Sequence, residues 1–383
     1  MNEDVLGQHY TEVPGQRVVA AALRAAYAWS VRDVHRNAAM LEIARMTGVV
    51  MEAHGPGLGP VTPVELVDHL RAPLGHLLAG VRGQPAELAD VVLLDDDGRL
   101  TENAYDLVCE HVIPLKDVAG ERSWLPTWTT MHSDQIRQRV FTAMITSTKQ
   151  DEYVGSRRFL IEHPAGGEQE LIELRDRAGG IRLAKGGYQD IPEEQIYRAP
   201  DGRGWWWPCL DCKWPMAVAS VGKVRCRYRP HNAVFDLVPG NRPSLRRRDG
   251  ARRPSPPAGQ AAEGAKCVDA GVWRFVVVPG ASELRIAAAA ERAGAKVSLW
   301  PFLDRFDLLV AAGGEKFAVD VKECLSLSAL IERLRTRPPS ARILLPKSCE
   351  WQLETLEDTL PGLAVVTETK FLGQIRSAVR KAR

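Results

Sequence analysis

The sequence predicts a multidomain α/β protein, and three observations lead to this fold class. Residues 1–150 are rich in alanine and carry the apolar repeat of α-helices. Residues 151–240 combine strand-like runs, RRFLIEHP at 157–164 and QELIELRD at 169–176, with paired cysteines. Residues 267–383 alternate helix-like and strand-like runs in the order αβββαβ. We therefore expect a helical N-terminal domain, a small β-rich module and a C-terminal α/β domain.

The N-terminal domain is predicted to consist of helices. Residues 16–54 have strong helix propensity and helical periodicity. A further helix is expected to begin at Pro63, because Thr62 can cap its first turn and proline suits the first helical position. Residues 98–112 and 132–147 are two more helix candidates. The expected role of this domain is to dock a partner or DNA.

Four potential metal ligands lie in a segment rich in tryptophan. Cys209 and Cys212 form a CxxC pair, and Cys226 and His231 follow a strand-like run. Three thiolates and one imidazole suit a closed tetrahedral Zn²⁺ site, and both spacings fall within the range of finger-like or ribbon-like modules. Because the segment offers few aliphatic side chains for a core, zinc is expected to supply much of its folding energy. Four unconnected residues in a loop region are the alternative.

A basic strand is expected within this module. Lys223, Arg225, Arg227 and Arg229 recur at every second position, which places all four on one face of a strand. Such a face suits the phosphates of a nucleic acid. A solvated edge strand protected by its charge is the alternative. The next segment, 241–266, has arginines among prolines and is expected to be a flexible basic linker.

The stretch FDLLVAAGGEKFAVDVKE predicts a hairpin, because a Gly-Gly pair favours a two-residue turn. Counting outward from Gly313 and Gly314 places Asp307 opposite Asp320. Lys322 emerges on the same face as Asp320. The opposite face is apolar and collects Leu308, Val310, Phe317, Val319 and Val321.

Two acids that face each other on antiparallel strands repel one another unless a cation compensates. Mg²⁺ or Mn²⁺ prefers carboxylate oxygens and keeps waters for a reaction, and a neighbouring lysine can orient an attacking water or help to deprotonate it. Asp307, Asp320 and Lys322 are therefore candidate catalytic residues. The alternative is that the two acids mark solvated strand ends, with Lys322 as a salt-bridge partner.

The segments around the hairpin predict the remaining elements of the C-terminal domain. WRFVVV at 273–278 reads as an apolar strand that leads into a helix starting near Ser282. KVSLW at 296–300 reads as a short strand. The elements after the hairpin are a crossover helix at 326–335, a strand at 341–346, a helix around 350–358, a strand at 363–369 and a final helix.

This arrangement resembles the PD-(D/E)xK, or restriction-endonuclease-like, nucleases. Asp320-Val321-Lys322 follows Asp307 by thirteen positions, as in the D…(D/E)xK signature of that family. The resemblance implies that Asp307 and Asp320 hold the catalytic metal and that Lys322 assists the water. It also implies that an acid on the first helix, here Glu283, adds to the cluster.

A wider resemblance covers residues 150–383 and, more loosely, the N-terminus. The helical region, RRFLIEHP, the cysteine module and the D…DxK domain together resemble the endonuclease encoded beside prokaryotic PIWI-RE proteins. Those three-gene islands also encode a DinG-type helicase and are thought to act against phage or plasmid DNA. The resemblance implies a PIWI-RE protein and this helicase as partners, which choose or open the target that the endonuclease cuts.

Charge and composition favour a protein that contacts a polyanion. The net charge is +2, but residues 201–272 hold 13 Lys and Arg against 6 Asp and Glu. No apolar run approaches the ~20 residues that span a bilayer, and no signal segment is recognisable. Seven cysteines, four of them scattered singly, indicate a reducing compartment rather than a disulfide framework. We expect a cytoplasmic protein.

Two functions from different classes remain open. The first is a metal-dependent DNA endonuclease of a defence system, with catalytic Mg²⁺ or Mn²⁺, structural Zn²⁺, and a homodimer as one way to cut both strands. The second is a zinc-stabilised DNA-binding or adaptor protein whose nuclease-like domain has lost its chemistry. No P-loop or zinc-protease motif competes with them. Duplex, single-stranded and R-loop DNA and RNA all remain open as substrates.

Overall fold

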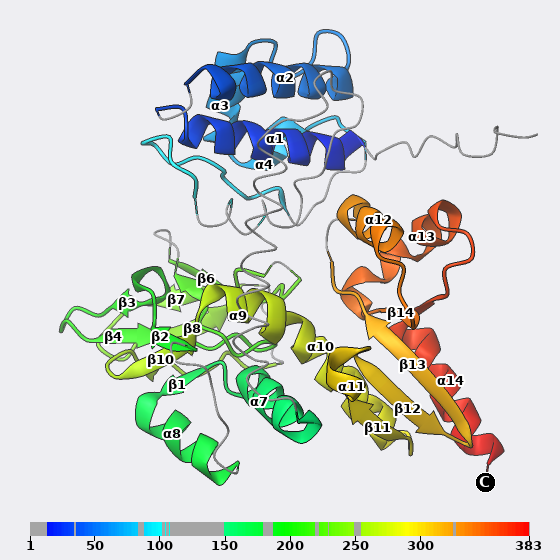
Figure 1. The fold of residues 1–383 in the computed structure, drawn as a ribbon. Helices are drawn as coiled ribbons and strands as arrows, with labels where there is room; N and C mark the ends of the chain where they lie inside the picture. Colours follow the sequence, from blue (N-terminus) through cyan, green and yellow to red (C-terminus); the bar gives the residue numbers. More distant parts are fainter. Residues whose placement is uncertain are drawn as a thin grey trace, which may run out of the picture. The chain divides into compact units, whose positions relative to one another are not determined.

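The computed structural model describes most of the chain, and Figure 1 shows the fold. The contacts within the chain divide it into two compact units. One unit contains the N-terminal helices together with Cys324–Pro338 and Glu354–Pro361, and the other contains the remainder. No helix within the described part is long and apolar enough to cross a membrane. The described residues are 14–33, 36–82, 88–101, 104, 107, 149–178, 187–218, 222–228, 230–248, 254–324 and 327–382.

The first unit is helical, as the sequence predicts for the N-terminal region. Thr62 accepts a hydrogen bond from the Glu65 amide at 3.2 Å, and Pro63 opens the helix, which confirms the predicted cap. The helix candidates at 98–112 and 132–147 lie almost entirely outside the described residues. The described helices of this unit are α1 (Pro14–Ser30), α2 (Arg36–His54), α3 (Pro63–Leu70), α4 (Leu74–Leu78), α12 (Leu327–Thr336) and all but the first residue of α13 (Leu353–Thr359).

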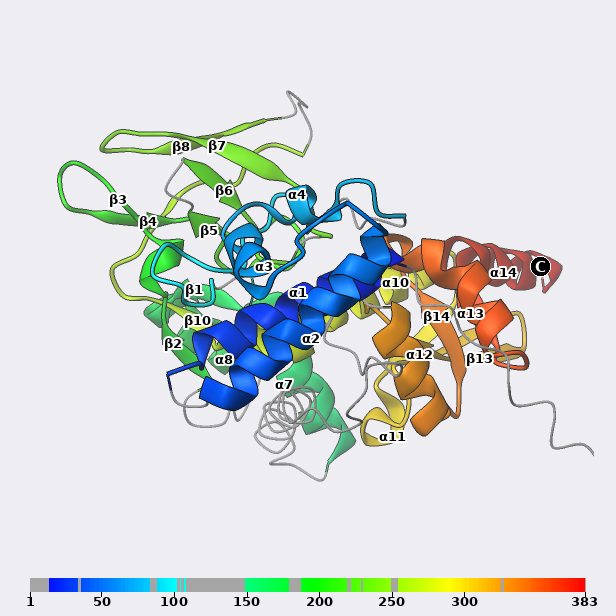
Figure 2. The same cartoon turned by 90° about the horizontal axis from the view of Figure 1, so that it is seen from above.

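Helix α1 forms the centre of the core of this unit and lies alongside α2 (Figure 2). Its alanines favour the helix and let neighbouring helices approach closely. Buried Arg24 pairs with Glu42 of α2, with 2.7 Å between Nε and Oε1. This pairing compensates two charges inside an otherwise apolar core.

The second unit begins with two helices where the sequence predicted a pair of strands. Helix α7 (Gln150–Glu162) contains most of RRFLIEHP and helix α8 (Glu168–Arg177) contains QELIELRD, so the prediction of strands was wrong. Tyr153, Arg157 and Leu160 are buried at helical spacing, and a helix places all three on one face. Burial of this face decides the conformation of α7.

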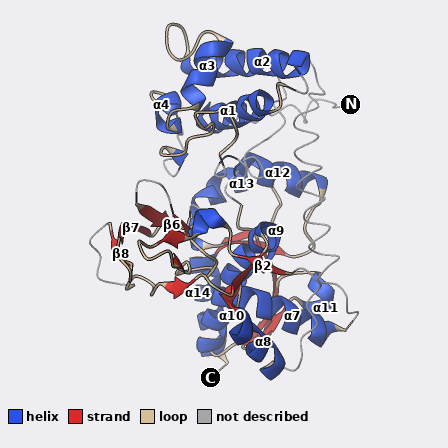
Figure 3. Cartoon of the chain, turned by 90° about the vertical axis from the view of Figure 1, so that its left-hand side faces the viewer, coloured by secondary structure: helices blue, strands red, loops and turns tan. Residues whose placement is uncertain are grey.

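Three small sheets follow. The predicted flexible linker at 241–266 contributes three strands among its described residues, so it is at least partly ordered. The elements are β1 (Ala165–Gly167), β2 (Tyr188–Asp190), η2 (Glu193–Gln195), β3 (Tyr197–Arg198), β4 (Gly204–Trp206), β5 (Ala217–Val218), β6 (Lys223–Arg225), β7 (Val234–Val238), β8 (Ser244–Arg247), β9 (Gln260–Ala261) and β10 (Ala265–Val268). Their orders are β1-β10-β2, β3-β4-β9 and β5-β6-β7-β8. Figure 3 shows β6, β7 and β8 of the last of them side by side.

The C-terminal part of the chain forms a five-stranded sheet and, with α12 between its third and fourth strands, follows the predicted αβββαβ order. The elements are α9 (Ala270–Val272), the π-helical turn η3 (Trp273–Val277), α10 (Val278–Arg292), β11 (Lys296–Leu299), α11 (Pro301–Asp304), β12 (Leu308–Ala312), β13 (Glu315–Val321), β14 (Arg342–Leu345), η4 (Lys347–Gln352), β15 (Val365–Thr367) and α14 (Glu368–Lys381). Strands β11 to β13 are antiparallel, and β13 to β15 are parallel. The strand order is β11-β12-β13-β14-β15.

The Gly-Gly hairpin has the predicted register. Ala312 pairs with Glu315, and both glycines of the turn have positive φ, 57° at Gly313 and 84° at Gly314. A Cβ atom on Gly313 would also lie 2.1 Å from the carbonyl oxygen of Ala378, so only glycine fits there. The turn thereby fixes the register of both strands.

One face of this sheet is packed against helices α10 and α14. Leu308, Val310, Val319 and Val321 are buried on this face, and Phe317 is partly buried against them. This confirms the predicted alternation of apolar and polar side chains along the two strands. The buried members are Leu308, Val310, Ala312, Val319, Val321, Leu344, Val366, Ile286, Ala287, Ala290, Phe371, Leu372, Ile375 and Ala378.

The predicted strand WRFVVV at 273–278 is helical, so that prediction was wrong. Helices α9 and α10 run on through η3 without a break. Asp269 caps the start, because its carboxylate accepts hydrogen bonds from the Gly271 and Val272 amides at 2.7 and 3.1 Å. The π-helical turn precedes Pro279, which has no N–H for the regular helical ladder.

Candidate active site and metal centre

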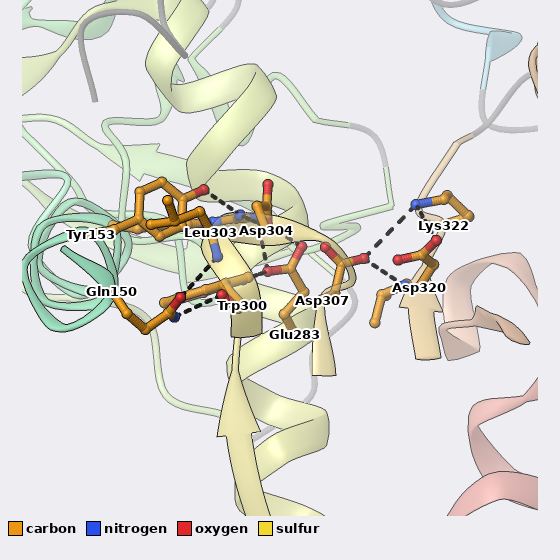
Figure 4. Close-up of polar contacts among 11 residues, drawn as sticks. Gln150, Tyr153, Glu283, Trp300, Leu303, Asp304, Asp307, Asp320 and Lys322 are labelled. Carbon is orange, nitrogen blue, oxygen red and sulfur yellow. Dashed lines mark hydrogen bonds and ion pairs between the residues drawn. The ribbon is translucent and has the colours of Figure 1, made fainter. Parts of the chain in front are cut away.

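The hairpin brings together the three residues that the sequence selects as catalytic candidates (Figure 4). Leu308 pairs with Val319, so Asp307 and Asp320 occupy the next position of the two strands. The Nζ atom of Lys322 lies 3.9 Å from Oδ2 of each aspartate. The side chains of Asp307, Asp320 and Lys322 are 13%, 14% and 28% exposed, so the group remains open to solvent.

Backbone contacts hold Asp307 in this position. Its Oδ2 accepts a hydrogen bond from the Val321 amide at 2.7 Å, and its carbonyl oxygen accepts one from the Trp300 amide at 2.8 Å. The first contact ties the carboxylate directly to the neighbouring strand. Its side chain is therefore oriented by the sheet.

The electrostatic environment of Asp307 favours a bound cation. Burial and the nearby charge of Glu283 raise the pKa of Asp307 to about 8, although Lys322 and Arg157 act in the opposite direction. Its charged form is therefore disfavoured where no cation is bound. A cation held beside this carboxylate would favour the charged form.

Glu283 lies close to this group, on helix α10, but its carboxylate already has partners. The Nη2 atom of Arg157 lies 3.2 and 3.0 Å from its two oxygens, and Trp300 Nε1 donates to Oε2. The side chain is 2% exposed, and burial raises its pKa against the opposing effect of Arg157 and Trp300. Its role as an additional acid of the cluster stays a prediction.

A left-handed turn lies between the end of β11 and Asp307. Trp300, Phe302, Leu303 and Asp304 all have positive φ, between 44° and 73°, which costs a non-glycine residue about 1–2 kcal/mol. Such strain persists only where surrounding contacts hold it. Gln150 of α7 supplies two of them, because its Nε2 donates to the Trp300 carbonyl and its Oε1 accepts from the Leu303 amide, both at 2.8 Å.

The four predicted zinc ligands form one compact cluster. The sulfurs of Cys212 and Cys226 are 3.8 Å apart, and His231 Nδ1 lies 3.6 Å from Cys209 Sγ and 3.5 Å from Cys226 Sγ. Around a tetrahedral zinc, two sulfurs lie about 3.8 Å apart and a sulfur lies about 3.6 Å from a nitrogen. The ligand atoms all lie within 4.8 Å of one another, so the cluster could bind a metal such as zinc.

The surroundings of the cluster also suit a metal. The Asp211 amide donates to Cys209 Sγ and Trp273 Nε1 donates to Cys212 Sγ, both at 3.4 Å. Burial raises the pKa of Cys212 and of Cys226, so stable thiolates there need a cation. Four buried tryptophans, Trp206, Trp207, Trp214 and Trp273, also supply an aromatic core that the small number of aliphatic residues did not predict.

The predicted basic strand is shorter than the four-residue pattern. Strand β6 includes Lys223 and Arg225, but it ends before Arg227, whose guanidinium carbon lies 5.8 Å from the ring centroid of Trp214. Arg229 lies outside the described residues. Lys223 and Arg225 therefore share a strand face, whereas Arg227 packs against the aromatic core.

Strand β8 and the residue after it extend the basic face by two arginines, Arg246 and Arg248, from the segment predicted to be a flexible linker. Asp236 of β7 pairs with Lys223 on one side and with Arg246 on the other, so these side chains lie on the same face. Arg248 also reaches Asp236, with 2.9 Å between Nη2 and Oδ1. We call Lys223, Arg225, Arg246 and Arg248 the basic face of this sheet.

Two family models match parts of this chain, and both agree with the resemblance to the endonuclease of PIWI-RE islands. Residues 280–383 match a family model described as REase associating with pPIWI_RE, where REase stands for restriction endonuclease, and residues 15–167 match pPIWI_RE three-gene island domain Y. Comparison with curated proteins and with solved structures gives no match. The first segment contains Glu283, Asp307, Asp320 and Lys322. The two matches confirm the recognition from sequence and support a REase-like protein of the pPIWI_RE island.

Proposed function

We propose that this protein is a metal-dependent DNA endonuclease that hydrolyses phosphodiester bonds in a bacterial defence system. The observation that carries the proposal is the cluster of Asp307, Asp320 and Lys322 at the end of one hairpin. The REase match over the same segment supports a nuclease-like role in defence against foreign DNA. Two carboxylates can hold a divalent cation for metal-assisted phosphodiester hydrolysis, and an amine beside them can orient the attacking water.

The chemistry assigns a task to each side chain. Asp307 and Asp320 would hold Mg²⁺ or Mn²⁺, which stabilises charge on the phosphate and on its leaving oxygen when it is bound. Lys322 would position the attacking water and help to remove its proton. In the cysteine module, Cys209, Cys212, Cys226 and His231 would hold structural zinc.

The basic face is proposed to contact DNA phosphates. Replacing Lys223, Arg225 and Arg246 together by alanine is expected to weaken DNA binding about equally for all sequences, because phosphate contacts carry no sequence information. The slope of log affinity against log salt should fall by about 2–3. Fluorescence anisotropy at several salt concentrations measures both effects.

A matched control removes three positive charges elsewhere. Arg158, Arg175 and Arg177 lie on α7 and α8 and are 56%, 40% and 71% exposed. Their joint replacement by alanine should leave the salt slope within about 0.5 of the wild-type value, since they lie outside the proposed contact. An equal loss in both triple variants would show a general charge effect and would remove the basic face as a binding site.

Partners follow from the two family matches, whose names imply association with pPIWI_RE island proteins. We extend this to a PIWI-RE protein and a DinG-type helicase that select or open the target, and to a homodimer that places one active site on each strand. Purification of the three proteins after joint expression tests the partnership. Separate elution of all three would contradict it.

The decisive experiment for the activity is a cleavage assay over several substrates. The full chain is incubated with labelled duplex, single-stranded and R-loop DNA and with RNA, in Mg²⁺, in Mn²⁺ and in a chelator. We expect cleavage of at least one DNA substrate in Mg²⁺ or Mn²⁺ and none in the chelator. DNA binding without cleavage of any substrate would favour the zinc-stabilised adaptor instead.

A further inference from the structure

Arg157 of α7 reaches the candidate active site from outside the segment that matches the REase model. It lies within the match to domain Y, and its side chain is 5% exposed. Its Nη1 atom lies 2.5 Å from Asp304 Oδ1 and 3.1 Å from the Tyr153 hydroxyl, and its Nη2 atom donates to Glu283. The guanidinium carbon lies 4.5 Å from the ring centroid of Trp300. The residue is therefore fixed on several sides.

Both carboxylate oxygens of Glu283 accept hydrogen bonds in this arrangement. Arg157 donates to both of its oxygens, and Trp300 Nε1 adds a second donor to Oε2. A buried carboxylate that accepts three hydrogen bonds from two donor atoms is stabilised as a counterion in the interior. A metal ion that took the place of Arg157 beside these oxygens would leave its guanidinium partly uncompensated.

The two aspartates have a different environment. Asp307 and Asp320 face the amine of Lys322 and remain more exposed than Glu283. Within the described part of the chain, three or more metal-binding side chains gather at the Cys3His cluster, and Glu283 does not form such a group with the aspartates. Figure 4 shows Glu283 on the side of Trp300 and Asp304, and Asp320 and Lys322 on the other side of Asp307.

We infer that Arg157 is a positioning residue of the nuclease site. Arg157 holds Glu283 as its counterion, so Asp307 and Asp320 are the acids that bind the metal. The inference rests on the proposed function, because it concerns the metal position of that same site. It also makes α7 part of the active site, although α7 lies more than a hundred residues before the REase match.

Charge balance gives the inference a measurable consequence. The site contains two cations, Arg157 and Lys322, and four acids, Glu283, Asp304, Asp307 and Asp320. Loss of Arg157 frees the oxygens of Glu283 and adds one net negative charge. Both changes favour a divalent cation, so metal affinity should rise when Arg157 is neutralised.

The test titrates Mn²⁺ into four full-length proteins and follows free Mn²⁺ by electron paramagnetic resonance. Arg157→Gln is expected to bind Mn²⁺ at least about tenfold more tightly or to take up a second ion, and Glu283→Gln at least about tenfold more weakly. The double variant Arg157→Gln/Glu283→Gln has the wild-type net charge. It should return to within about threefold of the wild-type affinity, because no metal ligand has been lost.

Other results overturn the inference. If Glu283 is a metal ligand, the double variant stays as weak as Glu283→Gln. If Arg157 is only a structural brace, Arg157→Gln binds Mn²⁺ more weakly than wild type and the double variant does not recover. If Arg157→Gln fails to fold, the double variant and Arg157→Lys still test the inference. Arg157→Lys keeps the positive charge, so its affinity for Mn²⁺ should stay within about threefold of the wild-type value.

The same titration separates this inference from the proposed function. Asp320→Ala should remove the Mn²⁺ site from the otherwise wild-type protein. Absence of any Asp320-dependent Mn²⁺ binding in wild type would overturn the proposed function, and the inference with it. Asp320-dependent binding that the double variant fails to restore would overturn the inference alone.

Discussion

Asp320→Ala is expected to abolish Mg²⁺-dependent DNA cleavage, with a fall of at least about 10³-fold in kcat. Asp320 lies beside Asp307 in the hairpin and shares Lys322 with it, so its removal takes away half of the proposed acid pair. Lys322→Ala is expected to have an effect of similar size, because the attacking water loses its orienting amine. DNA affinity should stay within about threefold of wild type in both variants, since the basic face lies on another sheet.

Strand β13 itself offers matched controls. Glu315 and Lys316 lie on the same strand as Asp320, and both are exposed. The strand ends one residue before Lys322. Glu315→Ala and Lys316→Ala remove the same charges without touching the site, so cleavage should stay within about twofold of wild type. Single-turnover cleavage of a labelled substrate compares the four variants. Wild-type cleavage by Asp320→Ala and Lys322→Ala would end the assignment of the active site.

The core of this site could be predicted from sequence because its determinants are local. The turn glycines are adjacent, and the alternation of apolar and polar residues along the two strands fixes which side chains share a face. Asp307, Asp320 and Lys322 are then placed by counting alone. The zinc ligands are likewise set by short spacings, so their convergence needed no knowledge of distant contacts.

The wrong predictions share a different cause. The run at 273–278 is apolar throughout, and such a run fits a buried helix as well as a buried strand. The cap at Asp269 was the available signal for a helix, and it lies outside the run itself. In α7, the burial of Tyr153 and Arg157 at helical spacing depends on what the helix packs against, which the sequence does not state.

Arg157, Trp300 and Asp304 were missed because their roles depend on long-range contacts. Arg157 meets Glu283 across 126 positions of the chain and Asp304 across 147. No local spacing predicts such a pairing. The left-handed turn is also invisible in sequence, because its residues are not the glycines that usually signal positive φ.

Cys209→Ser is expected to lower zinc content from one ion per chain to none and to destabilise the cysteine module by about 4 kcal/mol or more. The remaining two thiolates and one imidazole form an incomplete site, and burial then disfavours the charged form of Cys212 and Cys226. The stack of Trp214 on Trp273, with ring centroids 4.3 Å apart, lies beside this cluster and should loosen with it. Metal analysis and tryptophan fluorescence during thermal unfolding report the two effects.

Cys267→Ser separates loss of metal from loss of a buried sulfur. Cys267 is fully buried, and its thiol contacts the carbonyl oxygen of Asp190. It lies on β10, outside the cluster, so its replacement should cost only about 1–3 kcal/mol and leave zinc content unchanged. Zinc retained by Cys209→Ser, or no zinc in the carefully purified wild type, would remove the metal centre. A module that stays folded without zinc would instead show that Trp206, Trp207, Trp214 and Trp273 stabilise it by themselves. The comparison thus decides whether metal binding or the aromatic core holds this module together.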